Sequence, residues 1–300
     1  MNVLSLFDGM SCGQIALDKL GIKVDNYFAS EIDKYAMQVA KKNYPNTNHI
    51  GSVTDVKGND LPGIDLLIGG SSCQNFSFAG NRIGMSTGED IEILNLEQYL
   101  SLKENGFTFK GESYLFWEYV RILKETKPKY FLLENVKMSK KWEDVITEAI
   151  GLPPIMINSR IKSAQNRPRL YWTNISGVEN IEKDSPIKFI DICESTGEIE
   201  GYTLSEKATD RAYNNKRNRA FFIDKDKVGT LQANQYKQST DSLYLKYGDN
   251  MARKVTPIEC ERMQTVPDNY TDCVSNTQRY KMLGNGWTVD VIAHIFKNLK

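Results

Sequence analysis

Short apolar runs alternate with stretches of helical periodicity along the first half of the chain. Four runs predict buried strands, at residues 3–7, 27–30, 64–68 and 130–133, and two later strands are predicted at residues 155–157 and 170–172. Helical spacing of apolar positions predicts helices at residues 14–20, 34–43, 112–125, 257–263 and 289–299. Strands that alternate with helices in this way predict an α/β fold built on a parallel sheet.

Two segments break the alternation. Residues 84–112 are polar and acidic and long for a loop in a compact domain, so they predict either a mobile lid or an inert surface insertion. After Gly177 the chain stays polar as far as residue 250, with weak strand signals at residues 221–223 and 242–247. We therefore expect a small region of different character there.

Composition narrows the class of protein. The chain has 300 residues, 40% of them hydrophobic, and its 38 basic and 38 acidic residues give a formal net charge of zero. A nucleic-acid partner must therefore meet a local basic face. Five cysteines without a Cys-x-x-Cys pair predict neither a disulfide framework nor a zinc site. No apolar run approaches the roughly 20 residues of a membrane span, and Asp8 cuts the N-terminal apolar run too short for a signal peptide.

Cys73 lies in the sequence Gly-Gly-Ser-Ser-Cys-Gln-Asn-Phe-Ser, directly after the strand predicted at residues 64–68. Ligands and chemistry collect at strand ends in open α/β sheets. An ionised thiol at such a place can attack an electrophilic carbon. A small, buried hydrophobic side chain is the alternative interpretation.

A glycine-containing loop, residues 7–13, follows the first predicted strand and opens a helix. Its glycines let a ligand approach the backbone, and the helix N-terminus offers unpaired N–H groups. Glu31 ends the next strand, about 20 residues further on, where an acid holds ribose hydroxyls in nucleotide-binding folds. Together the loop and the acid predict a cofactor that contains adenosine.

Three charged side chains accompany the later strands. Glu134 ends the strand at residues 130–133, a buried position that suits a carboxyl group to donate a proton. Arg167 and Arg169 flank Pro168, so in an extended segment both guanidinium groups would point to one side. They could bind phosphate or fix a carboxylate and a base. An ordinary acid at a strand end and a surface arginine pair are the alternatives.

The polar region also holds basic residues beside aromatic ones. The basic residues are Arg211, Lys216, Arg217 and Arg219, and the aromatic ones are Tyr213, Phe221 and Phe222. A nucleic-acid surface needs this combination, although an ordinary solvated face can have the same composition.

Six motifs, in this order, resemble those of the DNA (cytosine-5)-methyltransferases. They are Phe-x-Gly-x-x-x-Gly (7–13), Gly-Gly-x-x-Cys-Gln-x-Phe-Ser (69–77), Glu-Asn-Val (134–136), Gln-x-Arg-x-Arg (165–169), Thr-Pro-x-Glu-x-x-Arg-x-Gln (256–264) and Gly-Asn (284–285). The resemblance covers nearly all of the chain except about residues 180–250. Some segments look most like the animal de novo branch, namely residues 5–9, 29–31 and 283–287.

The resemblance implies a Rossmann-like methyltransferase sheet that depends on S-adenosylmethionine, with a small target-recognition region. Residues 1–177 would form the first part of the catalytic domain, residues 178–250 would recognise the target, and the helices of residues 251–300 would return to the catalytic domain. The protein would transfer a methyl group to C5 of a cytosine that is flipped out of double-stranded DNA.

The same resemblance implies roles for individual residues. Cys73 would attack C6 of the base and Glu134 would act at N3, while Arg167 and Arg169 would steady the ring oxygen, the carboxylate and a nearby phosphate. The cofactor-binding residues would be Phe7, Asp8, Gly9, Met10, Ser11, Cys12, Glu31, Ile32, Ser52, Val53, Asn285, Gly286 and Trp287. The DNA-binding residues would be Gln74, Ser77, Arg82, Arg211, Lys216, Arg217 and Arg219. No metal is implied.

The chain departs from the family pattern at two positions. Ser72 stands where the family normally has proline, which fixes the backbone before the nucleophile, and Ser52 stands where the family favours aspartate. Three hypotheses follow: a DNA methyltransferase, the same chemistry on transfer RNA, and an inactive homologue that only binds DNA. The presence of all four predicted catalytic residues favours an active enzyme.

The predicted function also bears on the location and the assembly of the protein. We expect it in the cytoplasm, with the nucleoid, if its source is bacterial or phage, and in the nucleus if its source is eukaryotic. Pairing of two copies is compatible with the de novo-type segments, but the charge pattern does not establish it.

Overall fold

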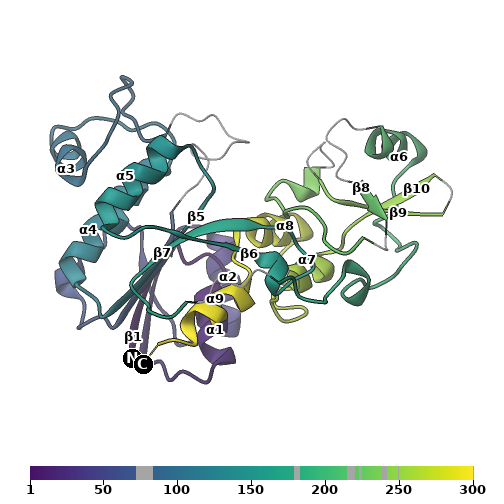
Figure 1. The fold of residues 1–300 in the computed structure, drawn as a ribbon, viewed down its shortest axis with the longest axis horizontal. Helices are drawn as coiled ribbons and strands as arrows, with labels where there is room; N and C mark the ends of the chain where they lie inside the picture. The colour runs from purple at the N-terminus through teal and green to yellow at the C-terminus, as the bar shows by residue number, and fades with distance from the viewer. Residues whose placement is uncertain are drawn as a thin grey trace.

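The computed structural model describes residues 1–71, 84–178, 183–214, 220–222, 225–237, 242–248 and 250–299. Within these ranges a seven-stranded sheet forms the centre, in the order β3-β2-β1-β4-β5-β7-β6 (Figure 1). Its strands are β1 (Asn2–Leu6), β2 (Asn26–Ser30), β3 (Asn48–Gly51), β4 (Leu66–Gly70), β5 (Tyr130–Val136), β6 (Ile155–Asn158) and β7 (Pro168–Thr173). Neighbouring strands from β3 to β5 are parallel, and β7 is antiparallel to β5 and β6. The predicted α/β fold with a largely parallel sheet is confirmed.

Helices cover both faces of this sheet. Those that do so are α1 (Cys12–Lys19), α2 (Lys34–Asn43) and α9 (Val289–Phe296) on one face and α3 (Leu96–Glu104), α4 (Phe116–Thr126) and α5 (Lys140–Ile150) on the other. The described residues also include α6 (Glu206–Tyr213), which packs on the small sheet, and α7 (Pro257–Met263) and α8 (Asn276–Asn285). Successive strand side chains point to opposite faces. Val3 and Ile68 therefore share a core with α1, α2 and α9, whereas Leu4 and Leu67 share the other core with α3, α4 and α5. The result is a three-layer arrangement (Figure 1).

A second, smaller sheet lies beyond α7 and α8, at the right of Figure 1. It consists of β8 (Ala220–Phe222), β9 (Tyr244–Tyr247) and β10 (Met251–Lys254), in the order β10-β9-β8. Buried residues of this part, such as Val228, Leu231 and Leu245, join the same hydrophobic core as α1 and α9. β10 begins at Met251, immediately after the predicted end of the small region, and pairs with β9.

Residues 84–112 are more regular than the sequence indicates. They include α3, whose N-cap residue Asn95 accepts a hydrogen bond from the backbone N–H of Gln98 at 2.8 Å. Only Leu96 and Tyr99 of this helix are buried, which is too sparse a pattern to show helical periodicity. Tyr99 donates to the buried carboxylate of Glu118 on α4 at 2.5 Å. This packing favours the interpretation of an insertion over that of a lid.

Other elements were also missed by the apolar pattern, namely β3, α5, α6 and α8. Helix α5 buries only Trp142 and Ile146, and α8 buries Arg279 and Gly284 beside its apolar residues. When a buried helix face contains polar or small residues, the apolar residues no longer recur with the helical period, and the helix cannot be recognised from that pattern. Among the described residues, no helix is long and apolar enough to cross a membrane.

Candidate active site

The loop after β1 has a left-handed backbone at every second residue. Phe7, Gly9 and Ser11 have φ angles of 57°, 59° and 65°, a region that residues other than glycine rarely adopt. The backbone N–H of Ser11 donates to the carbonyl of Asp8 at 3.1 Å, which closes the turn before α1. We refer to residues 7–13 as the cofactor loop.

Glu31 fastens the cofactor loop to the end of β2. Its carboxylate accepts hydrogen bonds from the backbone N–H groups of Gly9 at 2.8 Å, Ile32 at 2.7 Å and Asp33 at 2.8 Å. β1 and β2 are parallel neighbours, so the segments that follow them meet at one edge of the sheet. The predicted pairing of a glycine loop with an acid at the next strand end is therefore present in the fold.

Asp8 is the buried centre of the cofactor loop. Its carboxylate accepts hydrogen bonds from the hydroxyl groups of Ser11 and of Tyr27, the latter at 2.8 Å. Burial raises the pKa of Asp8 from 3.8 to about 6, although these hydrogen bonds oppose the rise. Asp8 therefore supports the loop from inside and changes charge near neutral pH.

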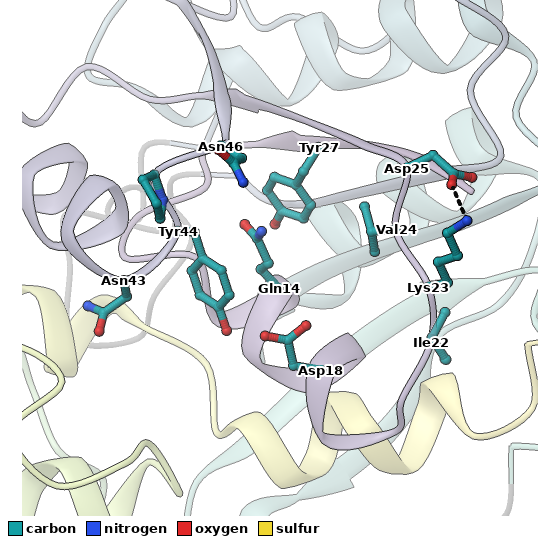
Figure 2. Close-up of a pocket in the computed structure, with 11 residues that line it drawn as sticks. Gln14, Asp18, Ile22, Lys23, Val24, Asp25, Tyr27, Asn43, Tyr44 and Asn46 are labelled. Atoms are coloured by element: carbon teal, nitrogen blue, oxygen red, sulfur yellow. Dashed lines mark ion pairs between the residues drawn. The ribbon is translucent and has the colours of Figure 1, made fainter.

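Tyr27 also lines a polar cavity of about 450 Å³ that lies beside α1, the end of α2 and the start of β2 (Figure 2). Gln14, Asp18 and Asn46 are among its lining residues. None of the predicted cofactor-binding residues lines it, so this cavity is distinct from the predicted cofactor site. Tyr27 lies between the cavity and the cofactor loop, because its ring lines the cavity and its hydroxyl group donates to Asp8 of the loop.

The predicted cofactor-binding residues fall into an accessible set and a supporting set. Those that solvent reaches are Phe7, Gly9, Glu31, Ile32, Ser52, Asn285, Gly286 and Trp287, and those that are buried are Asp8, Met10, Ser11, Cys12 and Val53. Ile32 is 71% exposed, which leaves an apolar surface next to the Glu31 carboxylate. An apolar surface beside a carboxylate fits the purine and the ribose hydroxyls of S-adenosylmethionine.

The buried set is braced by the C-terminal part of the chain. The hydroxyl group of Tyr270 donates to the carbonyl of Met10 at 2.7 Å, and the thiol of Cys12 donates to the carbonyl of Trp287 at 3.8 Å. Burial raises the pKa of the Cys12 thiol to about 12, so Cys12 remains a neutral thiol. These contacts make the cofactor loop depend on residues far along the sequence.

Cys73 lies outside the described residues, as do Gln74, Ser77 and Arg82. Both ends of their segment are described and fixed. The side chain of Asn135 donates to the hydroxyl group of Ser71 at 3.1 Å. At the other end, a Cβ added to Gly84 would lie 1.9 Å from the ring of Trp142, and Gly84 has a φ angle of 71°. The segment that carries Cys73 therefore starts and ends at defined points.

Glu134 lies on β5 directly opposite Gly70 of β4, next to the start of the Cys73 segment. One carboxylate oxygen pairs with Nε of Arg169 at 2.9 Å, and the other accepts from the indole Nε1 of Trp287 at 3.1 Å. The side chain is largely buried, with 9% of the residue exposed. The structure thus places an oriented carboxyl group one strand away from the predicted nucleophile's segment.

Arg167 does not join this group, which corrects the prediction that the two guanidinium groups are aimed at one pocket. It is 3% exposed and donates to the carbonyls of Leu231 at 2.9 Å, Gly284 at 3.0 Å and Gly286 at 2.9 Å. The last two lie at the C-terminus of α8, where unpaired carbonyls attract a cation. Arg167 therefore braces the C-terminal segment, and only Arg169 binds Glu134.

Two buried glutamines, Gln264 and Gln165, support the same C-terminal segment as Arg167, and we call these three residues the brace. The sequence alone predicted no role for either glutamine. Gln264 donates to the carbonyls of Leu283 at 2.6 Å and Gly286 at 2.9 Å, and accepts from Thr288 at 2.9 Å. Gln165 donates to Gln264 at 3.1 Å. Gln165 begins the motif at residues 165–169, and Gln264 ends the motif at residues 256–264. A glutamine in such a motif can indicate a structural role, because a buried amide needs hydrogen-bond partners.

Of the four predicted basic residues in the small region, only Arg211 is described, exposed in the last turn of α6. Lys216, Arg217 and Arg219 lie outside the described residues. A cation that was not predicted, Lys246 of β9, lies 4.2 Å from the ring centre of Tyr213 and 5.3 Å from that of Phe222. Phe222 is 53% exposed, so the small sheet presents an aromatic side chain next to a lysine. In the described part of the chain, no three His, Cys, Asp or Glu side chains could hold a metal ion.

Comparison with known proteins identifies the family of this chain. A model of the family of C-5 cytosine-specific DNA methylases matches residues 1–150 and 194–300. The type II methyltransferase M1.ScrFI of Lactococcus lactis subsp. cremoris is 30% identical over 99% of this chain and 77% of its own length. The type II methyltransferase M.NlaX of Neisseria lactamica is 29% identical over 99% of this chain and 96% of its own length.

Among solved structures, the crystal structure of the S. pombe Dnmt2 methyltransferase matches with a TM-score of 0.74 and 16% identity. The match covers 100% of this chain and 99% of that one. At 16% identity, this match shows that the two proteins share a fold and no more than that.

The fold and the site define a methyltransferase that depends on S-adenosylmethionine. The chain belongs to the C-5 cytosine-specific DNA methylases, and it is an enzyme that methylates cytosine in DNA. The predictions of family, fold class and cofactor are confirmed.

Proposed function

We propose that the protein methylates C5 of cytosine in double-stranded DNA through a covalent bond between Cys73 and C6 of the base, with Glu134 acting at N3. The observation that supports this proposal best is the position of Glu134 and its two hydrogen-bond donors. Its carboxyl group is held by Arg169 and Trp287, opposite Gly70, where the Cys73 segment leaves the sheet. An acid and a thiol on neighbouring strand ends can act on two positions of one ring.

Cytosine C5 becomes a good nucleophile only after an addition at C6. The Cys73 thiolate forms a bond to C6, and the electron pair of the C5–C6 double bond moves to C5. Glu134 supplies a proton or a hydrogen bond to N3, which stabilises the charge that develops in the ring. When bound, S-adenosylmethionine would supply an electrophilic methyl group for C5 and would leave as S-adenosylhomocysteine. Transfer of the C5 proton to water then restores the double bond and expels the thiolate.

The target base leaves the duplex in this proposal. C5 and C6 are unreachable inside the base stack, and enzymes that act on a base extrude it into a pocket. Glu134 is largely buried, which suits a group that meets a base in a pocket. Asn135 has a positioning role because it fixes Ser71, two residues before Cys73.

We assign cofactor binding to the accessible set of residues. Glu31 would hold the ribose hydroxyls, Ile32 and Phe7 would supply apolar contact, and Ser52 and Asn285 would supply polar contact. Their exposure supports this assignment. The buried set, with Asp8 at its centre, would keep the loop in shape.

We assign target recognition to residues 178–254, since β10 pairs with β9 and so belongs to the small sheet, with residues 1–177 and 255–300 forming the catalytic domain. Base edges in the major groove specify a sequence, and contacts to phosphates position the protein. Exposed Arg211 would contact phosphate, and Phe222, which is 53% exposed, offers an apolar ring for base contact. The assignment is supported by the position of the small sheet, which lies apart from the central sheet and beyond α7 and α8 (Figure 1).

The test is the transfer of a radiolabelled methyl group from S-adenosylmethionine to duplex DNA, with transfer RNA as a second acceptor. We expect label in DNA, and a rate that falls at least about 100-fold in Cys73→Ala and Glu134→Gln. Bisulfite sequencing of DNA from expressing cells would then give the target site. Transfer to RNA alone would contradict the proposal.

A duplex that contains 5-fluorocytosine tests the covalent step, because fluorine prevents the loss of the C5 substituent. A stable adduct should form and should disappear in Cys73→Ala. Cys273→Ala is the matched control, since Cys273 is a partly buried cysteine between α7 and α8. An adduct that survives in Cys73→Ala would remove Cys73 as the nucleophile.

A further inference from the structure

The indole ring of Trp287 meets the carboxyl group of Glu134 rather than standing only beside the cofactor loop. Its Nε1 donates to one carboxylate oxygen at 3.1 Å. A Cβ added to Gly70 would lie 2.9 Å from this nitrogen and 3.0 Å from the same carboxylate oxygen. The absence of a side chain at Gly70 therefore gives the indole and the carboxylate room to meet.

The backbone on both sides of Trp287 is held by buried groups. The carbonyl of Gly286 accepts from Arg167 and from Gln264, each at 2.9 Å. The hydroxyl group of Thr288 donates to the side chain of Gln264 at 2.9 Å and accepts from Ser159 at 2.8 Å. The position of the indole is thus set by its neighbours.

The same brace reaches the small region. Arg167 donates to the carbonyl of Leu231, and the backbone N–H of Leu231 donates to Gln165 at 2.7 Å. A Cβ added to Gly284 would lie 2.2 Å from the backbone nitrogen of Ala233. Backbone from the small region therefore lies against the end of α8, a few residues before Trp287.

We infer that Trp287 is a positioning residue for Glu134, and that Leu231 supports the backbone beside Trp287 through Arg167 and through the Gln165–Gln264 pair. This inference rests on the proposed function, in which Glu134 acts at N3. Arg169 holds one carboxylate oxygen and Trp287 the other, so the carboxyl plane is defined by two donors from separate elements. The oxygen bound by Trp287 has a second lone-pair site, and a proton carried there would let Glu134 donate to N3 of the base.

The variant Trp287→Phe tests this role because it keeps an aromatic ring and removes the indole N–H. Loss of a hydrogen bond to a charged group corresponds to about a 10- to 100-fold change. We expect kcat at saturating DNA and cofactor to fall by about this factor. Phenylalanine keeps the aromatic ring with which Trp287 would contact the cofactor, so the Kd of S-adenosylmethionine, measured by calorimetry, should stay within about twofold of the wild-type value.

Trp172→Phe is the matched control. The indole of Trp172 also donates one hydrogen bond of similar length, 3.0 Å to Thr147, but on the α5 side of the sheet. We expect its kcat to stay close to that of the wild type. Circular dichroism of both variants shows whether they are folded to the same extent.

A double-mutant cycle separates positioning from general support of the fold. If Trp287 acts through Glu134, Trp287→Phe should have almost no further effect on kcat in a Glu134→Gln background. Equal effects in both backgrounds would overturn the inference. A tenfold weaker cofactor Kd with unchanged kcat would also overturn it, since Trp287 would then be a cofactor-binding residue alone.

The proposed function and this inference fail in different ways. Full activity of Glu134→Gln would overturn the role of Glu134, and the inference with it. Loss of activity in Glu134→Gln together with wild-type kcat in Trp287→Phe would overturn the inference alone.

Discussion

Removal of the Arg253 side chain should destabilise the protein more than any exposed charge change. Arg253 on β10 and Glu259 on α7 form an ion pair whose side chains are both 0% exposed. The guanidinium donates to the two carboxylate oxygens at 2.9 and 2.6 Å, and also to the carbonyls of Ser195 at 2.6 Å and Gly197 at 2.9 Å. One side chain therefore joins the small sheet, the segment before α6 and helix α7.

The expected loss follows from what Arg253→Met leaves behind. Glu259 would remain buried, with backbone N–H groups of Glu194 at 3.0 Å and Thr256 at 2.8 Å as its remaining donors. Breaking a buried pair by removing one partner costs about 3–5 kcal/mol. For a chain of 300 residues, the entropy of unfolding is about 0.6 kcal/mol per kelvin, so Tm should fall by about 5–8 °C.

The assay is thermal unfolding followed by circular dichroism, with urea unfolding at 25 °C beside it. Arg160→Met is the control, because the pair of Arg160 with Asp184 is 45% and 33% exposed, and an exposed pair contributes at most about 1 kcal/mol. Replacing both partners, as in Arg253→Met with Glu259→Leu, should recover part of the loss, since no buried charge is then left unpaired. A Tm of Arg253→Met within about 1 °C of wild type would refute this reasoning.

Three further outcomes are expected. Because burial raises the pKa of Asp8 from 3.8 to about 6, the folded protein binds a proton more tightly than the unfolded chain, and this stabilisation, present below pH 3.8, is lost as pH rises through 6. Urea unfolding between pH 4 and 7 should show a loss of about 2 kcal/mol in the wild type that Asp8→Asn lacks; equal pH slopes would contradict it. Gly84→Ala should lower Tm and the methylation rate together, because its Cβ would overlap the Trp142 ring at a cost of about 1–3 kcal/mol; a wild-type Tm would show that the ring moves aside freely. Arg169→Lys should lower kcat about tenfold, because lysine cannot present the guanidinium nitrogen that binds Glu134; an unchanged kcat in steady-state methylation would show that charge alone suffices.

The sequence predicted the central sheet well because its strands are buried on both faces. β1, β2 and β5 begin and end within three residues of their predicted positions, and α2 covers the predicted range of residues 34–43. Strands of this kind read as continuous apolar runs. The sequence did not predict α3, because few apolar residues lie on its buried face, or α8, because its buried face includes the polar Arg279.

The sequence predicted those parts of the candidate site that depend on the order of motifs and strands along the chain. Glu134 and the cofactor loop stand at strand ends, which the order of motifs reveals. The partners of Glu134 could not be predicted in the same way, since Trp287 lies 153 residues further along the chain. Arg167 and Arg169 look equivalent in sequence, but the carbonyls at the end of α8 bind one of them and Glu134 binds the other.

The contacts between the cofactor loop and the C-terminal segment have a consequence during synthesis. The thiol of Cys12 and the carbonyl of Trp287 are 275 residues apart, and the Tyr270 hydroxyl and the Met10 carbonyl are 260 residues apart. A ribosome that adds about 5–20 residues per second needs roughly 14–55 s to make the longer of these intervals. Until then the nascent chain has Glu134 without Trp287 and a cofactor loop without its brace. We therefore expect a growing polypeptide to be unable to methylate DNA until Tyr270 and Trp287 have been made and have reached the cofactor loop.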